Sequence, residues 1–214
     1  MVNDSNREKV FLPREPFLKR AFDFTLALVG LVLSSPLWLL LSLAIYLEDR
    51  GRVLFFQERR GREGRPFQMI KFRTMRYKGE GRHLVVYIEN DPRVTRVGRL
   101  LRVTAMDELP TLINILKGDM SFVGPKPLPS KIDVPWSPYD DISQVPGYNT
   151  RNQVRPGLTG IAQVYAPKGV DHKTKFHYDS LYVERMSFWL DLKLIFLSFW
   201  ITFRGKWEHR GKKI

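Results

Sequence analysis

FTLALVGLVLSSPLWLLLSLAIYL, at residues 24–47, is an apolar stretch that contains no charged side chain. As a straight helix it would extend about 36 Å, at about 1.5 Å per residue. That length is enough to cross a bilayer core of about 30 Å. The stretch is too long for the apolar region of a cleaved signal peptide, and no small-x-small site follows it. We therefore predict a membrane helix near the N-terminus.

The middle of this stretch carries Ser34, Ser35 and Pro36. Proline removes a helical hydrogen bond and kinks the helix axis. Each half alone would be about 18 Å long and would reach only partway through the bilayer core. Serine hydroxyls and neighbouring helices can satisfy the carbonyl groups that such a break frees. The pattern favours a re-entrant membrane helix over residues 17–49, broken at Ser35 and Pro36.

Basic residues flank the stretch on both sides: Arg14, Lys19 and Arg20 before it, and Arg50, Arg52, Arg59 and Arg60 after it. A spanning helix would place one of these clusters on the wrong side of the membrane, against the positive-inside bias. A re-entrant helix keeps both clusters on the cytoplasmic side. A spanning helix and the buried hairpin of a soluble protein are the alternatives, between which Trp38 and Tyr46 do not decide.

The composition narrows the choice of partners. The formal net charge is +13, from 35 Lys and Arg against 22 Asp and Glu, so an anionic partner is expected: nucleic acid, lipid headgroups or a phosphorylated substrate. The absence of cysteine excludes disulfides and thiolate zinc sites. The four histidines show no paired ligand spacing.

The remaining chain predicts a mostly helical α+β protein with three parts: an N-terminal arm (1–16), the membrane helix (17–49) and a cytoplasmic catalytic domain (50–214). Within the last part we expect strands at 53–57 and 67–75 around a glycine turn, and helices at 93–102 and 173–185. Residues 127–153 are expected to form a long loop. Residues 187–203 are strongly apolar but carry Asp191 and Lys193, which favours an interfacial helix, with a core helix as the alternative.

The tetrapeptide Asp107-Glu108-Leu109-Pro110 is the main candidate for chemistry. Pro110 is tolerated only in a first helical turn, so a helix is expected to begin just before it and to end at Gly118. A helix N-terminus favours ionised carboxylates, and an ionised Asp beside a second carboxylate can be a nucleophile beside a metal ligand. The alternative is a capped surface helix with acidic residues in its first turn.

Several cations lie in short motifs beside expected turns or element ends: Lys71, Arg73, Arg102, Lys126 and Arg155. Each one alone would be a solvated surface charge. Several of them together with two carboxylates suggest a site for a polyanion such as a diphosphate.

The order of these motifs resembles the bacterial sugar transferase family, the monotopic phosphoglycosyl transferases. The matching motifs are Lys19-Arg20-Ala21-Phe22-Asp23, Ser35-Pro36, Lys71-Phe72-Arg73-Thr74-Met75, Asp107-Glu108-Leu109-Pro110, Gly118 to Pro125, Arg155 to Gly160 and Asp179 to Glu184. The resemblance covers about residues 16–205. Each motif alone is weak, but this many in order is specific.

The resemblance implies transfer of a phospho-sugar from a UDP-sugar to a polyprenyl (undecaprenyl) phosphate, with release of UMP. It assigns Asp107 as the nucleophile that forms an aspartyl-phosphosugar, and Glu108 as a ligand of Mg²⁺. It assigns phosphate and uridine binding to Lys71, Arg73, Arg102 and the Pro125-Lys126-Pro127 motif, and Arg155 completes the predicted substrate-binding set. It also implies a bacterial inner membrane location with the active site on the cytoplasmic face, contact with membrane lipids, no nucleic acid, and a homodimer as one assembly to consider.

One departure from the family pattern concerns nucleotide recognition. The family usually has Pro-Arg-Pro where this chain has Pro125-Lys126-Pro127, and lysine keeps the charge but lacks the planar fork of arginine. No large N-terminal membrane domain precedes the motifs, so we expect a minimal version of the family. A nucleic-acid-binding protein would explain the charge but not the apolar stretch. A membrane scaffold without catalysis would leave the motifs unexplained.

Overall fold

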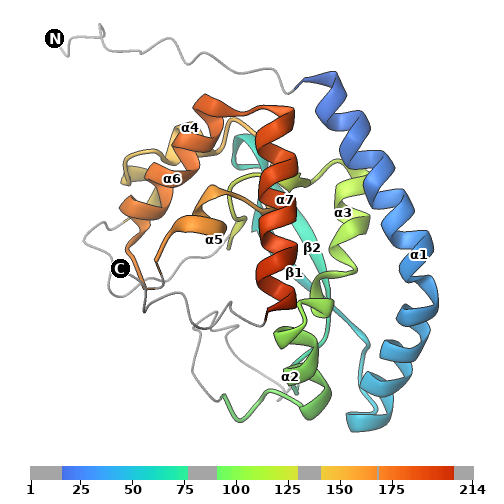
Figure 1. Ribbon diagram of the computed structural model, residues 1–214. Coiled ribbons are helices and arrows are strands. Elements are labelled where there is room, and N and C mark those ends of the chain that lie inside the picture. The colour runs from blue at the N-terminus through green and yellow to red at the C-terminus, as the bar shows by residue number, and fades with distance from the viewer. Residues whose placement is uncertain (1–15, 77–90, 130–140, 168, 205–214) are drawn as a thin grey trace, which may run out of the picture.

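The computed structural model describes residues 16–76, 91–129, 141–167 and 169–204. The helices are α1 (Phe17–Asp49), α2 (Arg96–Val103), α3 (Thr111–Lys117), α4 (Tyr148–Arg151), α5 (Ile161–Tyr165), α6 (His172–Arg185) and α7 (Phe188–Phe203). The strands are β1 (Leu54–Arg60), β2 (Pro66–Phe72), β3 (Ser121–Val123), β4 (Leu128–Pro129) and β5 (Gly157–Thr159). Short 3₁₀ turns are η1 (Arg62–Gly64), η2 (Met106–Glu108) and η3 (Ile142–Gln144). This confirms a mostly helical α+β fold (Figure 1).

The strands form two small sheets. The first has the order β2-β1-β4, with β1 and β2 antiparallel and Leu54 opposite Phe72. The tight turn between them places Glu63 and Gly64 at positive φ, 57° and 73°. The predicted hairpin is therefore confirmed. The second sheet pairs β3 and β5 in parallel, with Ser121 opposite Gly157.

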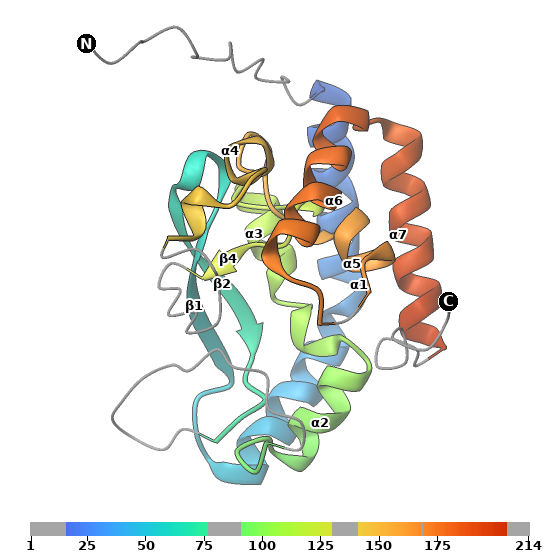
Figure 2. The ribbon, with the colours of Figure 1, turned by 90° about the vertical axis from the view of Figure 1, so that its left-hand side faces the viewer.

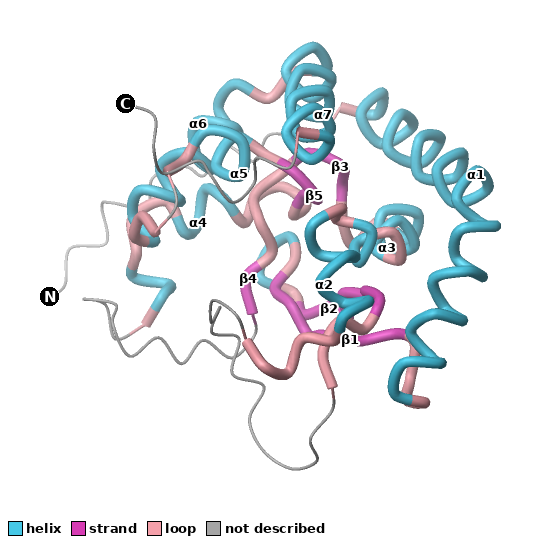
Figure 3. Tube along the Cα trace, turned by 60° about the horizontal axis from the view of Figure 1, so that its bottom comes forward, coloured by secondary structure: helices cyan, strands magenta, loops and turns pink. Residues whose placement is uncertain are grey.

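The helix α1 is continuous through Pro36, so the prediction of two helices separated by a break is wrong. The carbonyl of Val32 is the acceptor that Pro36 cannot use, because proline has no N–H. The Ser35 hydroxyl donates to this carbonyl at 2.8 Å, and the Trp38 indole donates to Ser34 Oγ at 3.1 Å. The Ser35 hydroxyl therefore replaces the missing bond to Val32. The result is a bowed helix, as Figures 1 and 3 show, with Pro36 near its middle.

α1 is long and apolar enough to cross a membrane, and only 6% of its most apolar window is buried by the rest of the protein. A helix in the core of a soluble protein would be mostly buried, so this finding disfavours the core hairpin. Leu33 and Leu39, for example, are 77% and 74% exposed. A large exposed apolar face of this kind marks a membrane or protein interaction surface.

Polar side chains attach the N-terminal part of α1 to the domain. Lys19, which is buried, donates to Asp191 Oδ2 of α7 at 2.6 Å and to the Val123 carbonyl of β3 at 3.1 Å. The Tyr182 hydroxyl of α6 lies 2.8 Å from the other oxygen of Asp191. Arg20 donates to the last carbonyls of α3, at 2.6 Å and 2.8 Å. The first motif of the chain therefore joins α1 to α3, α7 and β3.

α7 has one side buried against the domain and one side exposed to solvent. It buries Asp191 and Leu194, and its inner side packs with Val164, Tyr182 and Val123. Its outer side exposes five large side chains: Trp189, Phe196, Phe199, Trp200 and Phe203. This exposed aromatic face is typical of a helix at a membrane interface.

The described part of residues 127–153 has more structure than the predicted loop. It forms β4, η3 and α4, and its apolar side chains Leu128, Ile142, Val145 and Tyr148 build a buried cluster with Phe176 of α6. The composition of this segment suggested a loop because its anchors are long-range contacts with α6. Residues 130–140 lie outside the described residues, as do most of the N-terminal arm and residues 205–214.

Candidate active site

The candidate carboxylates precede a helix and do not lie within it. Asp107 and Glu108 belong to the 3₁₀ turn η2, and α3 begins only at Thr111, with Pro110 as its N-cap. The helix start predicted before Pro110 is therefore wrong, although the stop at Gly118 (φ 92°) is confirmed. The residue before the turn, Ala105, has a φ of 55°, a left-handed conformation that is uncommon for alanine. This kink turns the chain from α2 into η2.

Glu108 forms an ion pair with Lys71, whose Nζ lies 2.5 Å from Glu108 Oε1. Two fully buried residues of α3 hold the strand in place: Thr111 Oγ1 donates to the Ile70 carbonyl at 3.0 Å, and Asn114 Oδ1 accepts from the Ile70 N–H at 2.9 Å. Ile70 immediately precedes Lys71 on β2. The contact between α3 and β2 therefore sets the Lys71–Glu108 geometry.

The two carboxylates have opposite pKa shifts. Burial is the largest cause that raises the pKa of Asp107, to about 6, and the charge of Glu108 adds to it, against Lys71 and Arg102. For Glu108 burial acts in the same direction, but Lys71, Lys126 and Arg59 outweigh it and lower the pKa. Burial and the neighbouring carboxylate therefore dominate the pKa of Asp107. The predicted effect of a helix N-terminus on the pair stays a prediction.

Other cations surround this pair. Arg102 donates to Thr74 Oγ1 at 2.9 Å, and its charge acts on the pKa of Asp107. Lys126 has an exposed side chain, but desolvation still lowers its pKa. The charge of Glu108 opposes this shift, and the charges of Lys71 and Arg59 add to it. The structure therefore brings Lys71, Arg102 and Lys126 to the carboxylates, between the end of β2, α2 and the loop after β3.

Arg59 belongs to the same group, and sequence reasoning assigned it only to a basic flank. Its Nη1 donates to the Pro127 carbonyl at 3.1 Å, and Gln57 Oε1 accepts from its Nε and Nη2. Burial lowers the pKa of Arg59, and the charge of Glu108 opposes this shift. The signal in the sequence was its place in the alternating pattern of the strand that also carries Gln57.

A buried ion pair between α4 and α6 holds the main chain of the loop that carries Lys126. Arg151 of α4 donates through Nη2 to the Lys126 carbonyl at 2.5 Å and through Nε to Asp179 Oδ2 of α6 at 2.9 Å. Both side chains are almost fully buried. Pro125 and Pro127, on either side of Lys126, are also buried. The main chain of the Pro-Lys-Pro motif is therefore fixed while the lysine side chain reaches outward.

Two predicted substrate-binding residues lie elsewhere. Arg73 forms an ion pair with Asp49 at the end of α1, close against Gly51. Arg155 donates to the Gly118 carbonyl at 2.8 Å and lines a hollow of about 500 Å³ at the turn of the hairpin. The other lining residues of that hollow include Arg62, Arg65 and Asp119. Substrate binding by Arg73 and Arg155 stays a prediction.

A divalent cation has few ligands to choose from within the described residues, which contain no group of three His, Cys, Asp or Glu side chains. Mg²⁺ needs no such group, because it is usually held by one or two carboxylates, substrate phosphates and water. Glu108 keeps acceptor capacity beyond the single oxygen that Lys71 contacts. The residues present therefore fit Mg²⁺ that is bound together with a phosphorylated substrate.

The fold and this site together define a class of protein. A helix with an exposed apolar face is joined to a small α+β domain, and that domain holds a paired carboxylate among at least four cations. Such a combination suits chemistry on a phosphorylated compound next to a membrane.

The chain belongs to the bacterial sugar transferase family, whose model matches residues 14–205. It is 42% identical over 182 residues to a UDP-glucose:undecaprenyl-phosphate glucose-1-phosphate transferase of Caulobacter vibrioides, covering 83% of this chain and 66% of that protein. The transferase of the same name from Escherichia coli is 37% identical, covering 88% of this chain and 41% of its own length. The exopolysaccharide production protein ExoY of Rhizobium meliloti is 37% identical, with 83% and 82% covered. The chain thus spans less than half of one of these relatives and most of another.

Proposed function

We propose that this protein transfers a sugar-1-phosphate from a UDP-sugar to undecaprenyl phosphate and releases UMP. The single observation that carries this proposal is the carboxylate pair Asp107 and Glu108 inside a group of cations. The names of the relatives support the two substrates. The product would be a polyprenyl-diphosphate sugar, which begins polysaccharide or glycoconjugate assembly in the bacterial inner membrane.

The reaction would take place in two displacements at one phosphorus atom. An oxygen of Asp107 attacks the β-phosphorus of the UDP-sugar, and the bond to the bridging oxygen breaks, so that UMP leaves with the electron pair. An oxygen of undecaprenyl phosphate then attacks the aspartyl-phosphosugar, and the Asp107 carboxylate leaves. The Asp107 carboxylate and the lipid phosphate are both anionic nucleophiles, so neither displacement requires a general base.

The cations of the site would offset the repulsion between the carboxylate and the diphosphate. Lys71 and Arg102 act on Asp107, and Lys126 and Arg59 act on Glu108. Glu108 would hold Mg²⁺ against the donor diphosphate, and when bound the metal supplies charge neutralisation of the phosphate oxygens. Lys71 would then move from Glu108 toward a phosphate oxygen, as a compact and mobile ammonium group allows.

The membrane placement is part of the same proposal. Both ends of α1 lie on the cytoplasmic side and its bowed middle enters the bilayer, so the carboxylate pair works at the cytoplasmic surface. The basic residues on both sides of the helix and its unburied apolar face support this arrangement.

The decisive experiment uses the purified protein with a UDP-sugar and no lipid acceptor. We expect stoichiometric release of UMP and a phospho-sugar mass added to the peptide that contains Asp107. A panel of UDP-sugars also identifies the sugar, which the sequence does not reveal. Asp107→Asn serves as the matched control, because the amide keeps the size of the side chain but is a poor nucleophile. If UMP appears only when polyprenyl phosphate is present, and no adduct forms, the transfer is direct and Asp107 has another role.

A further inference from the structure

The hollow at the turn of the β1–β2 hairpin has a volume of about 500 Å³. Three segments form its wall: the hairpin turn, the chain just after α3 and the chain just before β5. The charged residues of this wall are Arg62, Glu63, Arg65, Asp119 and Arg155. Small-molecule sites in proteins are usually about 300–1,000 Å³ in volume, so the hollow is large enough to hold a ligand.

The hollow is separate from the carboxylate pair. Phe67 is the lining residue of β2 that is nearest in sequence to Lys71, and four residues of a strand span about 13 Å. Gly118 and Asp119 follow the last turn of α3, whereas the carboxylates precede its first turn. Figure 2 shows the turn of the hairpin beside α4, with α2 at the opposite end of the hairpin. A molecule in the hollow would therefore be a second ligand.

Hydrogen bonds hold the wall of the hollow in place. The Glu63 N–H donates to the Asn152 carbonyl at 2.7 Å, which joins the hairpin turn to the end of α4. The Arg155 Nε donates to the Gly118 carbonyl at 2.8 Å, which joins the other two segments. The cationic groups of the wall are thus carried by chain segments that are already fixed to the domain, so that little ordering is needed when a ligand binds.

Arg62 has a donor that the described part of the chain leaves without a hydrogen bond. Its Nε is buried and has no acceptor within hydrogen-bond range. Glu63 Oε1, with which it forms an ion pair, lies 3.7 Å away, too far for a hydrogen bond. A buried donor without an acceptor is unfavourable, and an oxygen atom of a ligand would satisfy it. This donor therefore indicates a ligand that carries oxygen acceptors.

The charges around the hollow favour an anion. Three arginines of the wall face two carboxylates, and the pair between Arg65 and Glu63 is weak because the Arg65 side chain is 82% exposed. Two more cations lie close by, since Arg20 contacts Gly118 and Lys117 is exposed next to it. Guanidinium groups bind phosphate through paired N–H donors. A phosphate group is therefore the anion that this wall fits best.

The rest of the wall fits the organic part of a phosphorylated molecule. Pro66 and Phe67 provide apolar surface on which a flat ring can stack. Asp119 accepts from Asn114 Nδ2 through Oδ2 at 3.1 Å, and a carboxylate has further acceptor capacity for a hydroxyl group. Inorganic phosphate would use neither feature and would fill only a small part of the volume. The combination of phosphate, hydroxyl groups and a flat ring is that of a nucleotide.

We propose that the hollow at the hairpin turn is a second anion site, which binds a soluble nucleoside monophosphate with its phosphate on Arg62, Arg65 and Arg155 and its base against Phe67. This inference rests neither on the transfer reaction nor on the membrane placement of α1. Inorganic phosphate and a lipid headgroup share the phosphate chemistry, and the test separates these sources.

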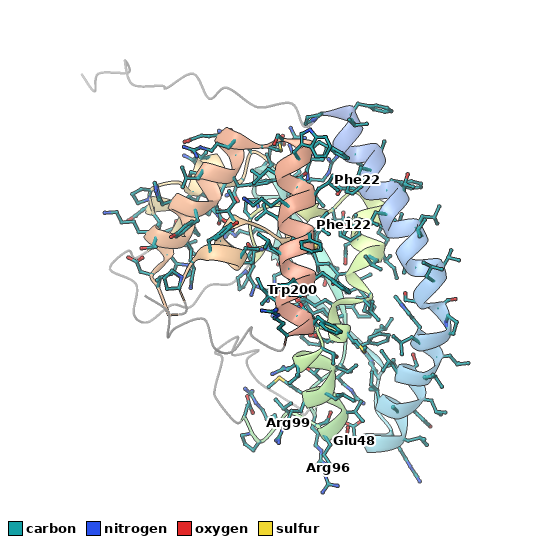
Figure 4. All side chains as sticks on the ribbon, viewed as in Figure 1. Phe22, Glu48, Arg96, Arg99, Phe122 and Trp200 are labelled. Carbon is teal, nitrogen blue, oxygen red and sulfur yellow. The ribbon has the colours of Figure 1, made fainter. Side chains whose placement is uncertain are left out.

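The test localises the bound nucleotide by chemical modification of arginine. The purified full-length protein in phosphatidylcholine nanodiscs is treated with phenylglyoxal, which reacts with accessible guanidinium groups, and the modified peptides are quantified by mass spectrometry. UMP is the probe, with ribose 5-phosphate and inorganic phosphate in parallel samples. We expect UMP to protect Arg62 and Arg65, ribose 5-phosphate to protect them less and inorganic phosphate least. Arg99, whose side chain extends outward from α2 in Figure 4, should stay reactive in every sample.

Charge variants of the hairpin turn test the assignment further. Arg62→Gln should weaken the protection of Arg65 by UMP by about tenfold in concentration, and Arg65→Gln should do the same for Arg62, because each removes one charge-assisted contact with phosphate. Glu63→Gln removes the carboxylate that competes for Arg65 and should strengthen protection. Lys173→Gln, which removes an exposed charge of α6, is the matched control and should leave it unchanged.

Arg102 reports separately on the carboxylate site. Protection of Arg102 without protection of Arg62 or Arg65 would overturn the second site and leave the proposed function intact. Protection at the hollow alone would support the second site and speak against nucleotide binding beside Asp107. Equal protection of the hollow by inorganic phosphate and UMP would overturn the nucleotide assignment. Protection that appears only in nanodiscs with phosphatidylglycerol, whether or not UMP is present, would overturn it in favour of a lipid headgroup.

Discussion

At the level of single residues, the main feature of the site is that two adjacent carboxylates have different pKa values. Burial and neighbouring charges cause this difference. Asp107 is shifted upward to about 6, whereas Lys71 holds the pKa of Glu108 below its usual range. The two residues are therefore in different charge states in weakly acidic solution. This difference suits a division of labour in which one carboxylate attacks and the other holds a cation.

The pKa of Asp107 gives a prediction for the pH dependence of the first displacement. Only the ionised carboxylate attacks, so release of UMP in a single turnover without lipid should fall as the pH drops through about 6. Lys71 lowers the pKa of Asp107, so Lys71→Met should move this decrease to higher pH. Lys173→Met removes an exposed charge that is not among the main causes of the Asp107 shift, so it should leave the midpoint in place. A profile that is flat around pH 6 in the parent protein would contradict the assignment of Asp107 as the attacking group.

The glycine at position 157 gives a second prediction at this scale. A Cβ atom there would lie 2.0 Å from the Gly124 nitrogen and 2.4 Å from the Thr159 carbonyl oxygen, and both are backbone atoms that cannot turn away. We expect Gly157→Ala to cost at least about 1–3 kcal/mol in the free energy of unfolding, by forcing β3 and β5 apart. Gly30→Ala is the control, because its Cβ would meet only a flexible Leu112 side chain at 3.2 Å. Thermal unfolding in detergent compares them, and equal midpoints would contradict the clash.

Among the elements, α4 and α6 hold the Pro-Lys-Pro loop through Arg151 and Asp179. Arg151→Met leaves Asp179 buried without its partner, which should cost about 3–5 kcal/mol in the free energy of unfolding. In the double variant Arg151→Met/Asp179→Asn the buried charge is gone, so its loss should be smaller than that of Arg151→Met plus that of Asp179→Asn. Strict additivity, measured by denaturant unfolding of the three variants, would mean that the two side chains do not interact energetically.

The elements also show what the sequence could and could not predict. The β1–β2 hairpin and α6 follow from local signals, such as the glycine turn and the run of helix-forming residues, and both are confirmed. The predicted interruption at Pro36 was wrong, and the described part of residues 127–153, predicted as a loop, has more structure than its composition suggested. Both outcomes depend on contacts that the folded chain makes. The Ser35 hydroxyl repairs the helix, and Phe176 of α6 gives Ile142, Val145 and Tyr148 a core to join.

The candidate site divides in the same way. Asp107, Glu108 and Lys71 could be found from motifs, and the structure places them together. Arg59 was missed, because its contact with the backbone carbonyl of Pro127 leaves no signal in the sequence beyond its place on the strand that also carries Gln57. The raised pKa of Asp107 could not be predicted from the sequence either, because its main cause is burial in the folded chain.

For the whole molecule, the course of α1 relative to the membrane can be tested by the side on which its ends lie. Cysteines introduced singly in place of Lys9 and Arg52 should both resist an impermeant thiol reagent in intact cells, because the helix enters and leaves by one face in the arrangement that we propose. Both should react once the membrane is opened. Labelling at position 9 alone in intact cells would show a spanning helix.

Pro36→Ala extends this test to the bow in the helix. Alanine restores the N–H that proline lacks, which should straighten α1 and move it toward a spanning form. In the Lys9→Cys protein we then expect increased labelling from outside the cell. Pro36→Gly, which restores the same N–H but keeps the chain easy to bend, should increase labelling less. No change with alanine would mean that attachment of α1 to the domain, and not Pro36, determines its course.

The ion pair between Lys19 and Asp191 can form only late in the synthesis of the chain. The two residues are 172 positions apart, and Lys19 is synthesised first. At about 5–20 residues per second, the ribosome needs roughly ten to thirty seconds to reach the aspartate. During that time α1 is available to the membrane while its lysine has no carboxylate to pair with. The contact between α1 and α7 therefore forms late in biosynthesis, and a chain released before position 191 keeps the Arg20 contact with α3 but lacks the carboxylate that pairs with Lys19.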